Sequence, residues 1–104
     1  MMFLQSALIL LVSVGLSLSG PALADQRVTT GQSLAATCAN CHGTHGRAAL
    51  GPGILPLAGR PAGWIQAQMA DFRSGRRPAT IMHQIARGYS ERQVEQLALW
   101  LEAQ

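Results

Sequence analysis

The side chains best suited to chemistry lie in one ten-residue stretch, TCANCHGTHG, residues 37–46. It holds both cysteines of the chain, and Cys38, Cys41 and His42 form a C-x-x-C-H motif. This is the arrangement that attaches haem of the c type. Two thiols one helical turn apart can each add to one vinyl group of the porphyrin, and the next residue directs its imidazole at the iron. The motif therefore predicts one covalently bound haem c, with His42 as the proximal ligand.

Three other uses of these side chains agree less well with the sequence. A disulfide between Cys38 and Cys41 would close a very small loop and stabilise little. A thioredoxin-like redox pair requires a βαβ setting, which the sequence does not predict. Zinc bound by both cysteines, His42 and His45 would need adjacent ligands at 41 and 42, whereas zinc motifs use two separated pairs. Haem attachment is the preferred interpretation.

A haem iron also needs a ligand on its other face, and the sequence offers four candidates: His45, Met69, Met82 and His83. His45 is too close to His42 to reach round a porphyrin. Met69 shares a helical face with Ile65 and Phe72, which is typical of a core residue. His83 would give a haem with two histidine ligands. The residues alone do not separate Met69 from Met82.

The elements that must position these side chains are all predicted to be helical, because no segment of residues 25–104 alternates like a strand. One helix is expected over residues 31–42, and one from Pro61 to a stop at Gly75 and Pro78. A shorter helix is expected over residues 79–87. Ser90 and Gln93 form a capping box for a last helix. The fold class is therefore all-α, with four to five short helices.

The segment between the first two helices, residues 43–60, contains five glycines and two prolines. This composition excludes a helix, and no alternation suggests a strand. A loop of this length in so small a domain is usually functional. We therefore expect it to wrap around the cofactor.

Residues 1–24 carry no charged side chain and contain the apolar run FLQSALILLVSVGLSL. Small residues at Ala22 and Ala24 predict a signal peptide cleaved before Asp25, and hence an exported, periplasmic protein. If it stayed uncleaved, the segment would be long enough to anchor the chain in a membrane. The remaining residues, 25–104, predict a single-haem domain, and a domain of this size is only marginally stable on apolar burial alone.

The charge of the chain is a net +3, and all eight basic residues are arginines. Aromatic residues are few and are not interleaved with the arginines, so nucleic-acid binding is not predicted. Four arginines lie close to Met82 in the sequence: Arg73, Arg76, Arg77 and Arg87. One hypothesis is a positive surface that steers an acidic redox partner. The alternative, which we prefer, is an ordinary solvated surface that bears arginines.

Five stretches of the sequence resemble a known family: CANCHGTHG, LGP, LAG, MADFRSGRRPATIMHQIARGYS and ALWLEAQ. They are similar to class I c-type cytochromes, most closely to the haem subunit of flavocytochrome c sulfide dehydrogenase. The resemblance covers residues 34–103. That subunit carries two cytochrome domains, whereas this chain has one C-x-x-C-H motif.

The resemblance implies a class I cytochrome c fold with haem attached at Cys38 and Cys41 and bound by His42. It also implies that Met82 is the sulfur ligand, and that the Pro52 carbonyl accepts a hydrogen bond from the proximal imidazole. The first and last helices would cross, burying Leu97 and Trp100.

The function implied is electron transfer, without enzymatic activity of its own. The partners would be redox proteins, and a flavoprotein sulfide dehydrogenase subunit is one candidate. Two alternatives are a free carrier to an oxidase or reductase, and a haem-based ligand sensor in which Met82 does not bind.

Overall fold

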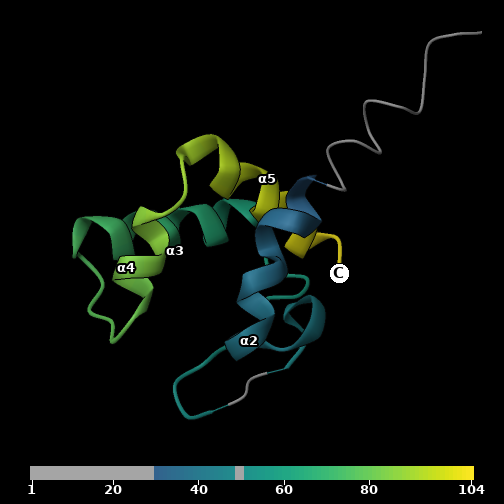
Figure 1. Cartoon of the computed structure of the whole chain (residues 1–104), viewed down its shortest axis with the longest axis horizontal. Coiled ribbons are helices and arrows are strands. Elements are labelled where there is room, and N and C mark those ends of the chain that lie inside the picture. Colours follow the sequence, from purple (N-terminus) through teal and green to yellow (C-terminus); the bar gives the residue numbers. More distant parts are fainter. Residues whose placement is uncertain (1–29, 49–50) are drawn as a thin grey trace, which may run out of the picture.

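The computed structural model describes residues 30–48 and 51–104, so the predicted signal peptide, residues 1–24, lies outside the described residues. Every regular element in the described part is helical, and residues 30–35 are helical as well (Figure 1). The elements are η1 (Ala36–Cys38), α2 (Ala39–His42), η2 (Thr44–Gly46), α3 (Ala62–Ser74), α4 (Met82–Arg87) and α5 (Glu91–Glu102). The prediction of an all-α domain is confirmed.

The helix predicted over residues 31–42 is present as an uninterrupted helical run over residues 30–42, which we call the amino-terminal segment. Its middle is the 3-10 turn η1, and its last turn is α2. Gly43 follows with a positive φ of 81°, a conformation that favours glycine and ends the helix. Both cysteines and His42 therefore lie in the last two turns of a short helix, as the motif requires.

Helix α5 begins at the capping box that the sequence predicts. The Ser90 hydroxyl accepts a hydrogen bond from the Gln93 amide at 3.2 Å, and the Gln93 side chain accepts one from the Ser90 amide at 2.8 Å. The apolar stripe of α5 forms the centre of the core, with Leu97 2% and Leu101 1% exposed. The amphipathic pattern and the cap together fix where this helix begins and which face it buries.

The amino-terminal segment crosses α5 at very short range (Figure 1). A Cβ atom placed on Gly31 would lie 2.6 Å from the Gln96 carbonyl oxygen and 2.8 Å from the Trp100 Cβ. Only glycine allows the two backbones to approach this closely. The crossing buries Trp100, which is 8% exposed, so the predicted contact between first and last helices is confirmed.

Helix α3 packs against both α4 and α5 and completes the core. It ends at Gly75, which has a left-handed conformation, as predicted. Helix α4 begins at Met82 rather than at residue 79, so the predicted start is wrong. Thr80 and Ile81 are β-branched and lose rotamer freedom in a helix, and Ile81 has a non-helical φ of −138°. The consequence is that Met82 is the first residue of its helix.

Candidate cofactor site

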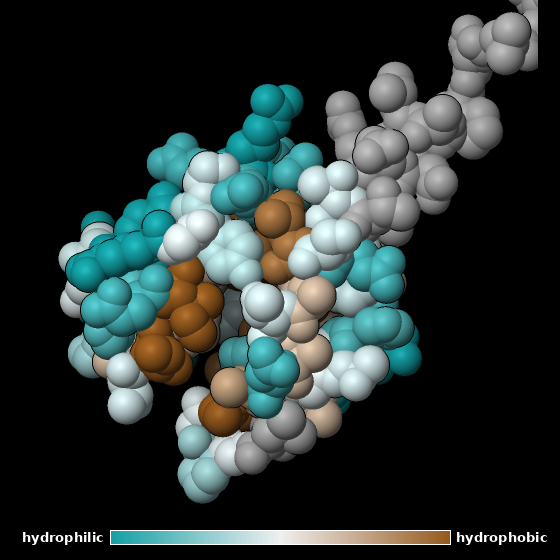
Figure 2. Space-filling view, viewed as in Figure 1, coloured by the Kyte–Doolittle hydropathy of each residue, from teal (hydrophilic) through white to brown (hydrophobic). Residues whose placement is uncertain are grey.

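A cavity of about 400 Å³ lies between the amino-terminal segment on one side and α3 and α4 on the other. Figure 2 shows hydrophobic residues gathered around a hollow in the face of the molecule. Residues of α5 and of the loop at 53–57 also contribute to the lining, which is mostly apolar. The long glycine-rich loop therefore does border a cavity, as expected from its length.

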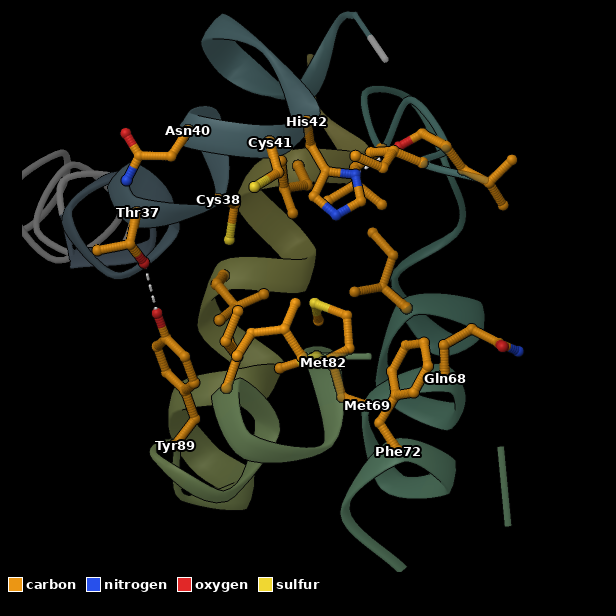
Figure 3. A pocket seen from close by; sticks show the side chains of 18 of the residues that line it. Thr37, Cys38, Asn40, Cys41, His42, Gln68, Met69, Phe72, Met82 and Tyr89 are labelled. Carbon is orange, nitrogen blue, oxygen red and sulfur yellow. Dashed lines mark hydrogen bonds between the residues drawn. The ribbon is translucent and has the colours of Figure 1, made fainter. Parts of the chain in front are cut away.

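Cys38, Cys41 and His42 line this cavity together. Their side chains point into it from the amino-terminal segment (Figure 3). Both thiols are free, so the disulfide considered above does not form here. Burial raises the pKa of the Cys38 thiol, and a backbone hydrogen bond offsets part of the increase. The structure brings the whole C-x-x-C-H motif to one wall.

The His42 ring is oriented by a backbone carbonyl. Its Nδ1 atom lies 2.5 Å from the Leu55 oxygen. A carbonyl can only accept a hydrogen bond, so Nδ1 carries the hydrogen, and Nε2 is left with a lone pair for a metal. An interaction of this kind fixes the orientation of a metal-binding imidazole.

The acceptor expected for this hydrogen bond was Pro52, and that assignment is wrong. Pro52 is exposed and does not line the cavity. It lies in a turn closed by a hydrogen bond of 3.2 Å from the Ile54 amide to the Gly51 carbonyl. This turn puts Pro52 on the outside of the loop and brings the next residues, including Leu55, toward His42.

Met69 and Met82 both line the cavity. They lie across it from His42 in Figure 3. Met69 is 8% exposed and belongs to the buried core with Ile65, as its helical spacing predicted. Met82 only packs against the edge of that core and is half-buried. The side chain of Met82 therefore makes less of the core packing than that of Met69.

The other histidines do not line this cavity. His45 packs edge-on against Trp100, with ring centroids 5.4 Å apart and an interplanar angle of 89°. His83 is half-buried, and its buried Nδ1 has no hydrogen-bond partner among the described residues. Among the histidines that the structure describes, His42 alone contributes to the cavity lining. Among the described residues no group of histidines, cysteines and carboxylates is placed to hold a metal, so the zinc site considered above is not formed.

Tyr89 was not singled out from the sequence, yet it joins the two sides of the site. Its hydroxyl lies 2.8 Å from the Thr37 hydroxyl and donates to the Leu34 carbonyl at 3.1 Å (Figure 3). Because the Tyr89 hydrogen is used on Leu34, the Thr37 hydroxyl is the donor of the other bond. These partners are more than 50 residues away in the sequence, so no local pattern could have revealed them.

The four arginines near Met82 do not all form a free positive surface, and this prediction needs correction. Arg73 is half-buried and donates to the carbonyl oxygens of Ala86, in the last turn of α4, and of Tyr89, just beyond it. Arg77 is half-buried as well. Arg76 and Arg87 are exposed, and Arg76 forms an ion pair of 3.1 Å with Asp71. Two of the four guanidinium groups, those of Arg73 and Arg77, are therefore half-buried and contact other parts of the protein instead of facing solvent.

The donor set around the cavity fits a haem. Two thiols flank an imidazole whose Nε2 is free, and a thioether lies across an apolar gap. Imidazole and thioether are the axial pair of low-spin c-type haems.

None of the helices in residues 30–48 and 51–104 is long and apolar enough to cross a membrane.

Comparison with known proteins agrees with this geometry. The profile of the cytochrome c family matches residues 28–104. The chain is 36% identical over 91 residues to a thiosulfate dehydrogenase electron acceptor of Stutzerimonas stutzeri, covering 85% of this chain and 42% of that protein. It is 31% identical over 102 residues to the cytochrome subunit of sulfide dehydrogenase of Chlorobaculum tepidum, covering 93% of this chain and 90% of that subunit.

Among solved structures, the chain is similar to cytochrome c4 of Acidithiobacillus ferrooxidans, with a TM-score of 0.63 and 28% identity. The match covers 85% of this chain and 53% of that one. The chain thus spans about half the length of cytochrome c4 and less than half of the Stutzerimonas protein. Family profile, sequence relatives and fold agree that this chain belongs to the cytochrome c family and is an electron-transfer protein.

Proposed function

We propose that this chain is a periplasmic single-haem electron carrier that accepts electrons from a dehydrogenase of reduced inorganic sulfur compounds. One observation carries the haem site: the thiols of Cys38 and Cys41 and the imidazole of His42 enter an apolar cavity together, with Met82 on the opposite wall. Cys38 and Cys41 would attach the cofactor by thioether bonds. His42 and Met82 would bind its iron.

Haem c, when bound, supplies a one-electron couple between ferrous and ferric iron. The residues of the chain control access to that couple. With His42 and Met82 both bound to the iron, no coordination position would be left for a substrate. This favours an electron carrier over a haem-based ligand sensor, which needs an open position.

The residues around the site also bias the reduction potential. The Leu55 carbonyl holds the His42 ring in one orientation. The apolar lining would shield a bound haem from water, which disfavours the more highly charged ferric state. The soft thioether of Met82 favours the ferrous state as well. The apolar lining and the thioether both suit a carrier that accepts electrons readily.

The proposed electron donor rests on the relatives. A cytochrome subunit of sulfide dehydrogenase and an electron acceptor of thiosulfate dehydrogenase both resemble this chain over most of its length. The Chlorobaculum subunit is almost fully covered. A cytochrome subunit of sulfide dehydrogenase can therefore be about as long as this chain, although the sequence resemblance led us to expect a subunit with two cytochrome domains.

The test is a visible spectrum of the protein isolated gently from its native periplasm, recorded before and after sulfide or thiosulfate is added. Flavin that co-purifies, with the haem reduced by sulfide, would identify a subunit of a flavoprotein sulfide dehydrogenase. In a second experiment, the flavin-free periplasmic fraction that contains a thiosulfate dehydrogenase is added back to the purified cytochrome. Reduction of the haem by thiosulfate in that mixture would identify the chain as a separate electron acceptor of that dehydrogenase. A haem that stays oxidised with both compounds would contradict the proposed donor and favour a free carrier to another oxidase or reductase.

Export is tested on the same preparation. The intact mass of the purified protein should correspond to a chain that begins at Asp25 and carries one haem. A mass that includes residues 1–24 would show instead that the segment is retained.

A further inference from the structure

Arg77 is the only arginine among the described residues that line the cavity. Its guanidinium carbon lies 4.7 Å from the centre of the Phe72 ring, and its Nη1 donates to the side-chain oxygen of Gln68. Its amide donates to the Asp71 carbonyl at 3.1 Å. Backbone and side chain are both held, so the guanidinium is kept at the cavity instead of extending into solvent.

The position of Arg77 relative to the cysteines is informative. Figure 3 shows Gln68 and Phe72 on the side of the cavity away from the Cys38 thiol. In a haem, the two propionate groups extend from the edge opposite the two vinyl groups. If Cys38 and Cys41 hold the vinyl edge, the propionates point toward the side where Arg77 is held.

We propose that Arg77 binds a haem propionate, with Gln68 and Phe72 as the residues that position it. The inference rests on the proposed haem site. A half-buried carboxylate requires a partner, and the planar guanidinium group matches carboxylate geometry with two parallel hydrogen bonds. By neutralising a negative charge beside the iron, Arg77 favours the ferrous state.

Arg76 offers a matched control for this proposal. It carries the same charge one residue away, but its side chain is 79% exposed and its partner is Asp71. It does not line the cavity. A change at Arg76 therefore removes an equal charge without removing a contact to the cofactor.

The experiment is a redox titration of the holoprotein and its Arg77→Gln and Arg76→Gln variants. At a fixed applied potential, Arg77→Gln should lower the ratio of ferrous to ferric protein by roughly three- to tenfold, since the negative charge of the propionate would no longer be neutralised. Arg76→Gln should change the ratio by less than about twofold, because solvent screens its charge. Arg77→Lys should fall between wild type and Arg77→Gln, since it keeps the charge and loses the fork.

The proposal would be overturned if Arg77→Gln and Arg76→Gln changed the ratio of ferrous to ferric protein equally, or if neither variant changed it. Haem content is measured separately on each preparation as the pyridine haemochrome. Absence of covalent haem from the wild type would refute the haem site itself, which keeps the two failures distinct. If Arg77→Gln does not assemble, Arg77→Lys is compared with Arg76→Lys, and a larger shift at position 77 is the expected result.

Discussion

The two walls of the cavity are built in opposite ways. The proximal wall consists of Cys38, Cys41 and His42, three side chains within five residues of one helical segment, and the Leu55 carbonyl lies against His42. The distal wall presents Met82 at the first turn of a six-residue helix that packs on α3. The side chains of the proximal wall are positioned by their spacing in one short helical segment, whereas Met82 in the distal wall is positioned by the packing of one helix on another. We therefore expect the proximal ligand set to fail only when a ligand itself is changed, and the distal ligand to respond also to residues that merely hold α4.

The largest effect should follow from removing the proximal thiols. Replacing both Cys38 and Cys41 by serine abolishes covalent haem attachment, because serine hydroxyls do not form thioether bonds. The measurement is haem staining of the protein on a denaturing gel. His45→Ala is the control and should keep full staining, because His45 packs against Trp100 and not against the cavity. Staining that survives in the double serine variant would contradict the proximal assignment.

The next largest effect concerns the distal ligand. Met82→Ala should open the sixth position, so that the reduced protein binds carbon monoxide at neutral pH and the reduction potential falls. Met69→Leu is the control, because it keeps the volume of a core residue. It should leave the iron six-coordinate and cost less than about 1.5 kcal/mol of unfolding free energy. Carbon monoxide binding by the Met69 variant and not by the Met82 variant would reverse the assignment.

A third effect should arise without touching any ligand. Arg73 donates to the carbonyl oxygens of Ala86 and Tyr89 and so ties the end of α4 to α3. Arg73→Ala removes a charged donor from two carbonyl groups and should lower the free energy of unfolding by about 1.5–3 kcal/mol. Denaturant titration followed by the absorption of the iron–sulfur bond should show that the Met82 ligand is lost before the helices unfold.

Arg76→Ala is the control for that prediction and should change stability by less than about 0.5 kcal/mol, since its ion pair is exposed. If both variants lost Met82 ligation only together with global unfolding, the distal wall would be no weaker than the rest of the fold.

The smallest effect tests the connection between the walls. Tyr89→Phe removes the hydroxyl that bonds Thr37 and the Leu34 carbonyl, at a cost of about 1 kcal/mol. The measurement is again the free energy of unfolding from denaturant titration. Because the bond joins the proximal and distal sides, the ferric holoprotein should also lose Met82 ligation at a slightly lower denaturant concentration. An unchanged stability would mean that water replaces the hydroxyl without loss.

Much of the fold was predictable, because it depends on local signals. Helix α5 has both a capping box and a regular apolar stripe, and Gly75 ends α3 as expected. The start of α4 was not predictable from helical residues alone, because Thr80 and Ile81 follow their β-branched preference for a non-helical backbone. The close approach at Gly31 was also missed, because its cause is the backbone of a helix far away in the sequence.

The site divides along the same line. The C-x-x-C-H motif predicts its own geometry, because all three side chains belong to one helical segment. The Pro52 assignment failed because the path of the loop decides which carbonyl reaches His42, and a turn places Pro52 outside. Arg73 and Arg77 were interpreted as surface charges, because their partners are found only in the packed structure.

The measurement that tests the central claim most directly is the proton NMR spectrum of the ferrous holoprotein with labelled methionine methyl groups. A methyl group bound over the iron experiences the ring current of the porphyrin and shifts far upfield. We predict one such signal in the wild type, retained in Met69→Leu and absent from Met82→Leu. No upfield methyl signal in the wild type, or its loss in Met69→Leu alone, would contradict a haem held between His42 and Met82.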